Sequence, residues 1–216
     1  MRRDELLMRY YRAMRDALGP RDWWPASTPF EVCVGAILVQ NTAWVGVKKA
    51  LANLDDAGAL DPAALYALPV SRLEELIRPA GYFRLKAARL KNLLEYLRES
   101  CGFDLDALAQ RPMEELREEL LQVRGVGPET ADSILCYALK KLTFVVDAYT
   151  RRILSRHGLV PEDVAYEELR EFFQDVLPKE WALYNDFHAQ LVRVGNRFCK
   201  PGNPRCGECP LGAFLP

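Results

Sequence analysis

Hydrophobic residues recur three or four positions apart along almost the whole chain, and this spacing restricts the fold more than any other feature. Such a period places apolar side chains on one face of an α-helix. The stretches 6–18 and 85–97 follow it throughout, whereas the β-branched and aromatic run at 142–146 is too short to found a sheet. Glycine and proline fall between the periodic stretches, which predicts an all-α fold of about ten helices. Ser71, with Glu74 three residues later, predicts a capping box at the start of one of them.

Size and composition exclude several classes of protein. Half of the 216 residues are hydrophobic, which rules out disorder and allows one large domain or two small ones. The 29 Lys and Arg nearly balance the 30 Asp and Glu, so any site for a polyanion must be local. No apolar stretch is long enough to cross a membrane, and the first residues do not resemble a signal-peptide core. We therefore expect a cytoplasmic protein that does not interact with membranes.

Charge is unevenly distributed along this nearly neutral chain. Basic residues are in excess at 83–98, 140–156 and 193–205, while 104–119 and 162–180 are acidic. A charged run on a helix is usually a solvated face. Three basic segments around one glycine-rich turn favour contact with a polyanion instead.

That turn lies between two expected helices, one ending near Val123 and the other beginning near Pro128. Proline suits the first helical turn, because its missing N–H leaves no hydrogen bond unmade there. Gly125 and Gly127 let the backbone approach a ligand, and free N–H groups at a helix start favour an anion such as a DNA phosphate. Contacts of this kind carry no sequence information. The alternative is an ordinary turn between helices, because two glycines alone are a weak signal.

The turn and its surroundings resemble the endonuclease III superfamily of DNA glycosylases, whose signature is a helix-hairpin-helix followed by a Gly/Pro-rich loop and an aspartate. The matching residues are Leu-x-x-Val-Arg-Gly-Val-Gly-Pro-Glu-Thr-Ala at 120–131 and Val-Val-Asp-Ala-Tyr-Thr-Arg-Arg at 145–152. Segments at 30–42, 81–87 and 187–199 resemble the family's early helix with its glutamine loop, its mid-domain helix start and its C-terminal helix. The resemblance covers essentially the whole chain.

This resemblance implies a division of the chain and a partner. One lobe of six helices over 28–133 would contain the hairpin, and a second would combine 1–27 with 134–216 and carry a cysteine loop at 199–209. Double-stranded DNA with a flipped-out damaged base would bind a monomer in the cleft between the lobes. The hairpin residues implied in DNA binding are Gly125, Gly127 and Thr130.

Two carboxylates carry the chemistry that the resemblance implies. Asp147 corresponds to the family's essential aspartate, and a carboxylate suits base removal because positive charge grows on the sugar as the base departs. Bifunctional members carry a lysine two residues after the second hairpin glycine, whose amine forms a Schiff base and permits strand cleavage. Glu129 stands at that position, which implies a monofunctional enzyme. The alternatives are an N-cap role for Asp147 and a helix-dipole role for Glu129.

Two aromatic segments narrow the resemblance to the 3-methyladenine DNA glycosylase III branch. They are Trp-Trp-Pro at 23–25 and Gln-Asn-Thr-Ala-Trp at 40–44. In that branch such segments shape the base pocket, which here would include Trp24, Pro25 and Trp44. Two aromatic faces can hold a flipped base, and tryptophan adds cation–π attraction when the base is a cationic alkylated purine. The alternative is that the tryptophans fill a core.

The glutamine of the second segment, Gln40, corresponds to the residue that the superfamily inserts into the gap left by the flipped nucleotide. The resemblance thus implies a glycosylase for an alkylated purine such as 3-methyladenine. A glycosylase for a neutral damaged or mispaired base, similar to endonuclease III, is the second alternative. A helix-hairpin-helix protein that binds DNA without chemistry is the third.

Three of the six cysteines, Cys199, Cys206 and Cys209, lie close together near the end of the sequence. In a cytosolic chain such clustering indicates metal rather than disulfides. Their spacing resembles the first three ligands of the endonuclease III iron–sulfur loop, which implies a 4Fe–4S cluster. The family's fourth cysteine would stand where this chain has Leu215. The alternatives are a non-cysteine or exchangeable ligand, a recruited cysteine, loss of the metal, or zinc with a histidine; the residues concerned are Cys33, Cys101, Cys136, His157 and His188.

Overall fold

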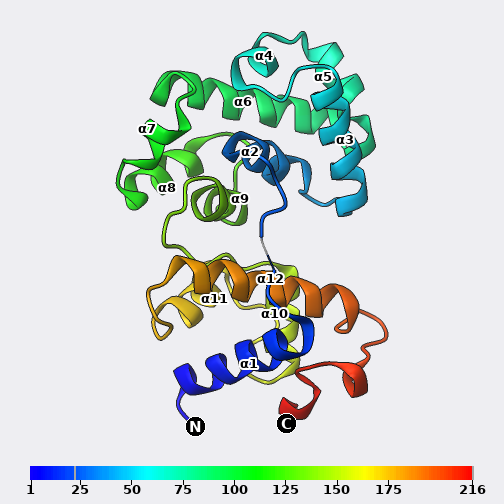
Figure 1. Cartoon of the computed structure of the whole chain (residues 1–216), viewed down its shortest axis with the longest axis vertical. Coiled ribbons are helices and arrows are strands. Elements are labelled where there is room, and N and C mark those ends of the chain that lie inside the picture. Colours follow the sequence, from blue (N-terminus) through cyan, green and yellow to red (C-terminus); the bar gives the residue numbers. More distant parts are fainter. Residues whose placement is uncertain (22, 216) are drawn as a thin grey trace. The chain divides into compact units, whose positions relative to one another are not determined.

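The computed structural model describes residues 1–21 and 23–215, and all regular structure in them is helical, which confirms the predicted all-α fold. The chain forms two compact units, each described by itself below (Figure 1). Unit 1 consists of residues 1–23 and 142–216, and unit 2 of residues 24–141. None of the helices in the described part combines the length and the apolar character that crossing a bilayer requires.

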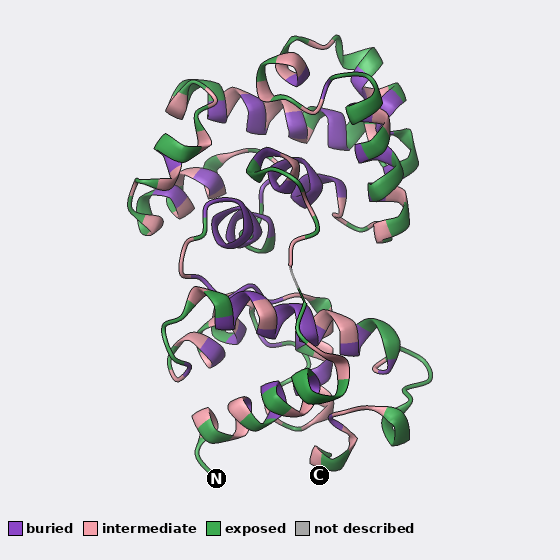
Figure 2. Ribbon diagram, in the orientation of Figure 1, coloured by how far each residue is buried: buried purple, intermediate pink, exposed green. Residues whose placement is uncertain are grey.

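Unit 2 is built around three largely buried helical segments, α2, α9 and η2 (Figure 2). The π-helical η2 packs against α2, so the unit extends beyond the hairpin helices as far as Lys141. Its elements are α2 (Pro29–Leu38), α3 (Trp44–Asp56), α4 (Pro62–Ala67), α5 (Val70–Leu76), η1 (Arg78–Ala80), α6 (Phe83–Cys101), α7 (Leu105–Ala109), α8 (Met113–Gln122), α9 (Pro128–Ser133) and η2 (Ile134–Ala138).

Helix starts in unit 2 follow capping chemistry, with one correction to the sequence prediction. The Thr28 side chain caps α2 by accepting a hydrogen bond from the N–H of Glu31 at 3.1 Å. The Glu31 carboxylate in turn accepts from the N–H of Ser27 at 2.7 Å. The predicted capping box at Ser71 is wrong, because α5 already begins at Val70 and its N-cap position makes no side-chain hydrogen bond.

Unit 1 packs its helices around a cluster of aromatic rings. Phe144 stacks on Phe173 with ring centroids 4.2 Å apart, and Phe187 meets both rings edge-on. Gly195 lets α10 approach α12, since a Cβ there would come within 2.5 Å of the Tyr149 side chain. The elements of unit 1 are α1 (Arg3–Leu18), α10 (Ala148–Arg156), α11 (Tyr166–Gln174), α12 (Trp181–Arg197), η3 (Cys206–Glu208) and η4 (Gly212–Phe214).

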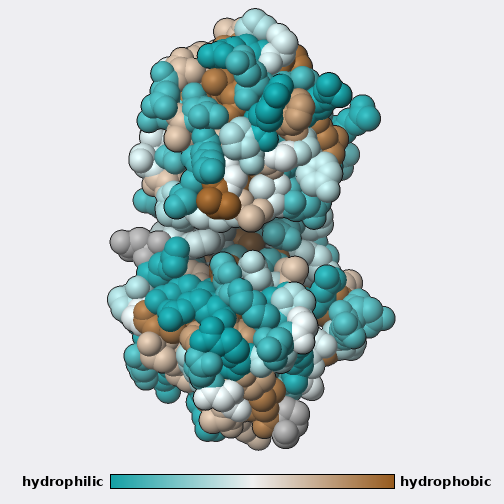
Figure 3. Space-filling model, turned by 90° about the vertical axis from the view of Figure 1, so that its right-hand side faces the viewer, coloured by the Kyte–Doolittle hydropathy of each residue, from teal (hydrophilic) through white to brown (hydrophobic). Residues whose placement is uncertain are grey.

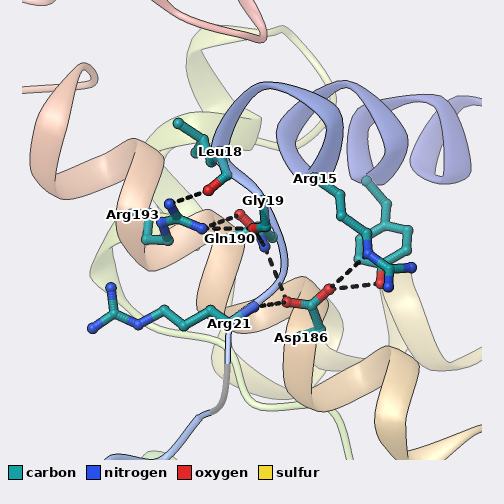
Figure 4. A network of polar contacts seen from close by, with 8 residues as sticks. Arg15, Leu18, Gly19, Arg21, Asp186, Gln190 and Arg193 are labelled. Carbon is teal, nitrogen blue, oxygen red and sulfur yellow. Dashed lines mark hydrogen bonds and ion pairs between the residues drawn. The ribbon is translucent and has the colours of Figure 1, made fainter.

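A polar network fixes the end of α1 to α12 (Figure 4). Arg193 donates to the carbonyl oxygens of Leu18 and, at 2.7 Å, of Gly19. Four residues after Gly19, the chain reaches the tryptophan pair. Asp186, also on α12, accepts from the Tyr11 hydroxyl at 2.7 Å. A cation at the carbonyl end of a helix is stabilising, so this network sets where the chain leaves α1.

Large exposed apolar side chains are few on the described surface. On the face drawn in Figure 3, hydrophilic residues cover most of each unit and hydrophobic ones occur singly or in small groups. Two of the exposed apolar residues, Val45 and Tyr82, lie next to helix starts of unit 2. The large exposed hydrophobic residues are Met1, Val45, Val70, Tyr82, Leu85 and Leu215.

Candidate functional site

The helix-hairpin-helix is present in unit 2, where α8 ends at Gln122 and α9 begins at Pro128. Gly125 has a φ of +101°, a conformation that side-chain-bearing residues rarely adopt. It also lies against Arg89, whose Cγ would be 2.3 Å from a Cβ at this position. Gly127 is exposed, and no atom lies within 4 Å of where its Cβ would be. The fold therefore requires glycine at Gly125, whereas Gly127 leaves the start of α9 accessible.

Gln40 lies between α2 and α3, and its amide contacts the hairpin. Its Nε2 donates to the carbonyl oxygen of Gly125 at 3.1 Å and to the Thr130 hydroxyl at 2.9 Å. Its Oε1 accepts from the Arg89 guanidinium. Thr130 is buried, so in this conformation its hydroxyl faces Gln40. The structure brings three of the predicted DNA-binding residues, Gln40, Gly125 and Thr130, into one network.

A buried lysine supports the same loop. Lys86 is only 1% exposed, although it lies in a basic run expected to form a solvated face, so that expectation is wrong for this residue. Its Nζ donates to the carbonyl oxygens of Leu38 and Ala80 at 2.7 and 2.8 Å and to the Thr42 hydroxyl at 2.6 Å. Burial lowers the pKa of Lys86 to about 8, and the Arg89 charge adds to this shift. All three donors of the ammonium are satisfied, which ties α2, the Gln40 loop and η1 together.

The predicted base-pocket tryptophans contact each other. The ring centroids of Trp24 and Trp44 are 5.3 Å apart with planes at 81°, and Tyr137 of η2 lies 5.6 Å from Trp24. The Trp24 indole covers Gly35 of α2, where a Cβ would come within 3.2 Å of its Nε1. Both tryptophans are half-buried and Pro25 is exposed. The two tryptophan rings meet edge to face, whereas a base stacked between parallel rings needs about 7 Å between their planes.

Two exposed side chains lie at helix starts in unit 2. Glu129 stands in the first turn of α9, where a carboxylate complements the helix dipole. Tyr82 directly precedes α6; it is 69% exposed and has a φ of +44°. Sequence reasoning did not single out Tyr82, and an aromatic residue directly after a glycine at a helix start is the signal that would have found it. An aromatic ring exposed to this extent can stack on a nucleic-acid base.

Asp147 of unit 1 is the N-cap of α10. Its Oδ1 accepts from the N–H of Thr150 at 2.7 Å and from the Thr150 hydroxyl at 2.9 Å. Its Oδ2 lies 3.6 Å from Nε2 of His188 on α12. Burial acts to raise the pKa of Asp147, but His188 and the two Thr150 hydrogen bonds outweigh it, so the pKa lies below its ordinary value. The carboxylate is therefore ionised although it is almost buried.

The three clustered cysteines, Cys199, Cys206 and Cys209, line one small cavity of unit 1. His157 and Leu215 line the same cavity, so the histidine is close to the thiols despite its distance in sequence. Among the described residues, no three Cys, His or carboxylate side chains are already arranged to hold a metal ion. Thiol chemistry, spacing and shared cavity fit an iron–sulfur cluster through three ligands, and the fourth is open. The other cysteines, Cys33, Cys101 and Cys136, belong to unit 2.

Two arginines of α10 hold the cysteine loop. Arg156 donates to the Cys199 Sγ at 3.3 Å and to the carbonyl oxygen of Lys200 at 2.7 Å. Arg152 donates to the carbonyl oxygens of Cys199 and Gly195, at 2.8 and 3.3 Å. The start of the loop is thus fixed to the helix that Asp147 caps.

Known proteins match this chain over most of its length. The HhH-GPD superfamily of base excision DNA repair proteins matches residues 34–179. A relative from Methanocaldococcus jannaschii, provisionally named a DNA repair glycosylase, is 42% identical over 212 residues, which cover 97% of this chain and 96% of the relative. The chain belongs to the HhH-GPD superfamily. Its resemblance to the endonuclease III superfamily is thereby confirmed, and it is a base excision repair DNA glycosylase of that family.

Further matches of this HhH-GPD glycosylase concern its cysteine loop and its fold. Residues 199–214 match the iron–sulfur binding domain of endonuclease III. Endonuclease III of Thermotoga maritima is 33% identical over 184 residues, covering 85% of this chain and 80% of the relative. The H. pylori 3-methyladenine DNA glycosylase bound to 1,N6-ethenoadenine superposes with a TM-score of 0.79 at 30% identity, over 91% of this chain and 98% of that one. An endonuclease III–DNA complex shares the fold, with a TM-score of 0.83 at 22% identity over 100% of this chain and 95% of that one.

Proposed function

We propose that the protein is a monofunctional DNA glycosylase that hydrolyses the N-glycosidic bond of an alkylated purine such as 3-methyladenine. The observation that carries this proposal is the aromatic group of Trp24, Trp44 and Tyr137 in unit 2. A cationic purine gains cation–π attraction of about 0.5–2 kcal/mol over such rings, which a neutral base lacks. The likeness to a 3-methyladenine glycosylase holding a modified adenine supports the same choice.

Base entry requires a rearrangement of the aromatic group. Trp44 is the first residue of α3, and its ring now meets Trp24 edge to face. Turning of Trp44 would open a slot between parallel rings, with Trp24 held in place over Gly35. The damaged nucleotide would leave the duplex to enter this slot, and Gln40 would leave Gly125 and Thr130 to occupy its place.

The proposed chemistry uses the ionised Asp147. As the C1′–N bond breaks, its electron pair leaves with the base and positive charge develops on the sugar. The Asp147 carboxylate stabilises this charge, and it orients a water whose oxygen bonds to C1′ while its proton passes to solvent. Because Glu129 stands where an amine would be needed for a Schiff base, the reaction ends at an abasic site.

Duplex DNA would be bound by a monomer, with the hairpin at Gly125 and Gly127 against the phosphates. Chromosomal DNA as substrate would place the enzyme in the cytoplasm, at the nucleoid. A 4Fe–4S cluster on Cys199, Cys206 and Cys209 would tie the cysteine loop together and could exchange electrons. The base chemistry would remain with Asp147.

The test is base release from duplexes that each carry one defined lesion: 3-methyladenine, 1,N6-ethenoadenine, uracil, thymine glycol or mispaired adenine. Released base is measured by chromatography, and abasic sites by strand cleavage with and without alkali. We expect fastest release of 3-methyladenine and cleavage only after alkali. Faster release of a neutral base would make the enzyme a glycosylase for deaminated, oxidised or mispaired bases.

Borohydride trapping tests the monofunctional assignment separately. Reduction joins an enzyme to DNA only through a Schiff base, so we expect no covalent complex with the wild-type protein. Glycosylases with a lysine nucleophile serve as the positive control. An efficient trap would assign the enzyme a lyase step and a different amine nucleophile.

A further inference from the structure

His188 is a buried polar residue to which neither the sequence motifs nor the family comparison gives a role. It is 4% exposed, and its neighbours along α12, Phe187 and Ala189, are buried apolar residues. A buried imidazole in such surroundings costs stability unless a polar partner compensates it. The Asp147 carboxylate provides one, with its Oδ2 3.6 Å from Nε2 of His188.

The packing of α10 on α12 produces this pair. Gly195 lies seven residues after His188 and therefore on the same face of α12. At Gly195 the two helices are in close contact, because the Tyr149 side chain fills the space of a Cβ. Tyr149 follows Asp147 by two residues, so the close approach at Gly195 helps to set the position of His188 opposite the N-cap of α10.

The two carboxylate oxygens have separate partners. Thr150 provides both hydrogen bonds to Oδ1, through its N–H and its hydroxyl. On α10 itself, Arg152 is bonded to the carbonyl oxygens of the cysteine loop and Arg151 is exposed. On α12, Asp186 lies two residues before His188 and hence on nearly the opposite side of the helix, where it contacts α1 (Figure 4). Within unit 1, His188 is therefore the titratable group that faces Oδ2.

We propose that His188 is a positioning residue for Asp147, whose protonated imidazole fixes Oδ2 and keeps the carboxylate ionised in its nearly buried site. This inference rests on the proposed catalytic role of Asp147. A carboxylate with both oxygens held stabilises charge on the sugar without having to reorient during the reaction.

Loss of the imidazole changes the balance of forces on Asp147. Burial favours the neutral acid, and only the Thr150 hydrogen bonds would then oppose it, so the pKa of Asp147 should rise. The carboxylate works only above its pKa, which places the effect on the acidic side of the pH–rate profile. A purely structural role of His188 would instead lower the rate by the same factor at every pH.

The experiment follows the Asp147 side-chain carboxyl carbon by NMR during an acid titration of the wild type, His188→Gln and His188→Asn. Asp147→Asn identifies the signal. Single-turnover base release is measured over the same pH series, and melting temperatures show which variants are folded. Tyr184→Phe is the matched control, since Tyr184 lies one turn earlier on α12, is equally buried, and has a hydroxyl without a hydrogen bond to any described residue.

Both His188 variants are expected to move the Asp147 titration midpoint and the acidic limb of the rate to higher pH by about one unit or more. Tyr184→Phe should leave both unchanged. An Asp147 midpoint that is the same with and without His188 overturns the inference, whatever the activity. A shifted midpoint in a wild-type protein that releases no base refutes the proposed function and leaves the Asp147–His188 coupling established.

Discussion

Trp44 can offer a bound base a stacking face and, for a cationic purine, attraction to its π system. Trp44→Ala should therefore lower kcat/KM for 3-methyladenine by an amount equivalent to about 1–3 kcal/mol of stacking. The neighbouring Val45→Ala is the control, because Val45 is 61% exposed and belongs to the same helix turn. Single-lesion duplexes provide the measurement. Equal efficiencies for the two variants would mean that Trp44 fills a core and does not contact the base.

Single residues show where sequence reasoning stops. Gln40, Gly125 and Thr130 were recognised as separate motif positions, but their shared network depends on contacts across 85 and 90 residues of chain. The basic run containing Lys86 predicted a solvated face, since nothing local reveals three backbone and hydroxyl acceptors gathered from other elements. His188 carries no motif at all, and only the packing of α10 on α12 gives it a partner.

Among the elements, the hairpin between α8 and α9 offers two glycines that differ in their surroundings. Gly125→Ala must place a side chain at a φ of +101° and displace Arg89, so the free energy of unfolding should fall by about 1–3 kcal/mol. Gly127→Ala meets no atom within 4 Å and should leave stability nearly unchanged. Denaturant unfolding of both variants measures the difference. Equal stabilities would show that the hairpin rearranges freely around Gly125.

Element boundaries were predictable where glycine or proline punctuates the chain. The turn between Val123 and Pro128 is one such case, and the structure has α8 and α9 on either side of it. Ser71 shows the opposite case, because the residue types of a capping box are present but the helix begins one residue earlier, after Pro69. Propensity identifies a helix start to within a turn, and the neighbouring packing decides the residue.

At the scale of the whole molecule, the cysteine loop should bind iron without determining the fold. We expect purified protein to contain iron and sulfide with a visible charge-transfer band, and to lose them to a chelator more readily than a four-cysteine protein does. Helical circular dichroism should persist after chelation, because the aromatic core of unit 1 around Phe144 does not include the thiols. Anaerobically prepared protein with neither iron nor sulfide would show that the cluster has been lost.

The central claim is that this HhH-GPD protein removes a damaged base by means of the ionised Asp147. Single-turnover release of free 3-methyladenine from a duplex tests it most directly, with wild-type protein compared to Asp147→Asn. The asparagine keeps the shape of the N-cap and removes the charge, so DNA affinity should be retained while release slows by about 100-fold or more. Release by Asp147→Asn at the wild-type rate would contradict the account.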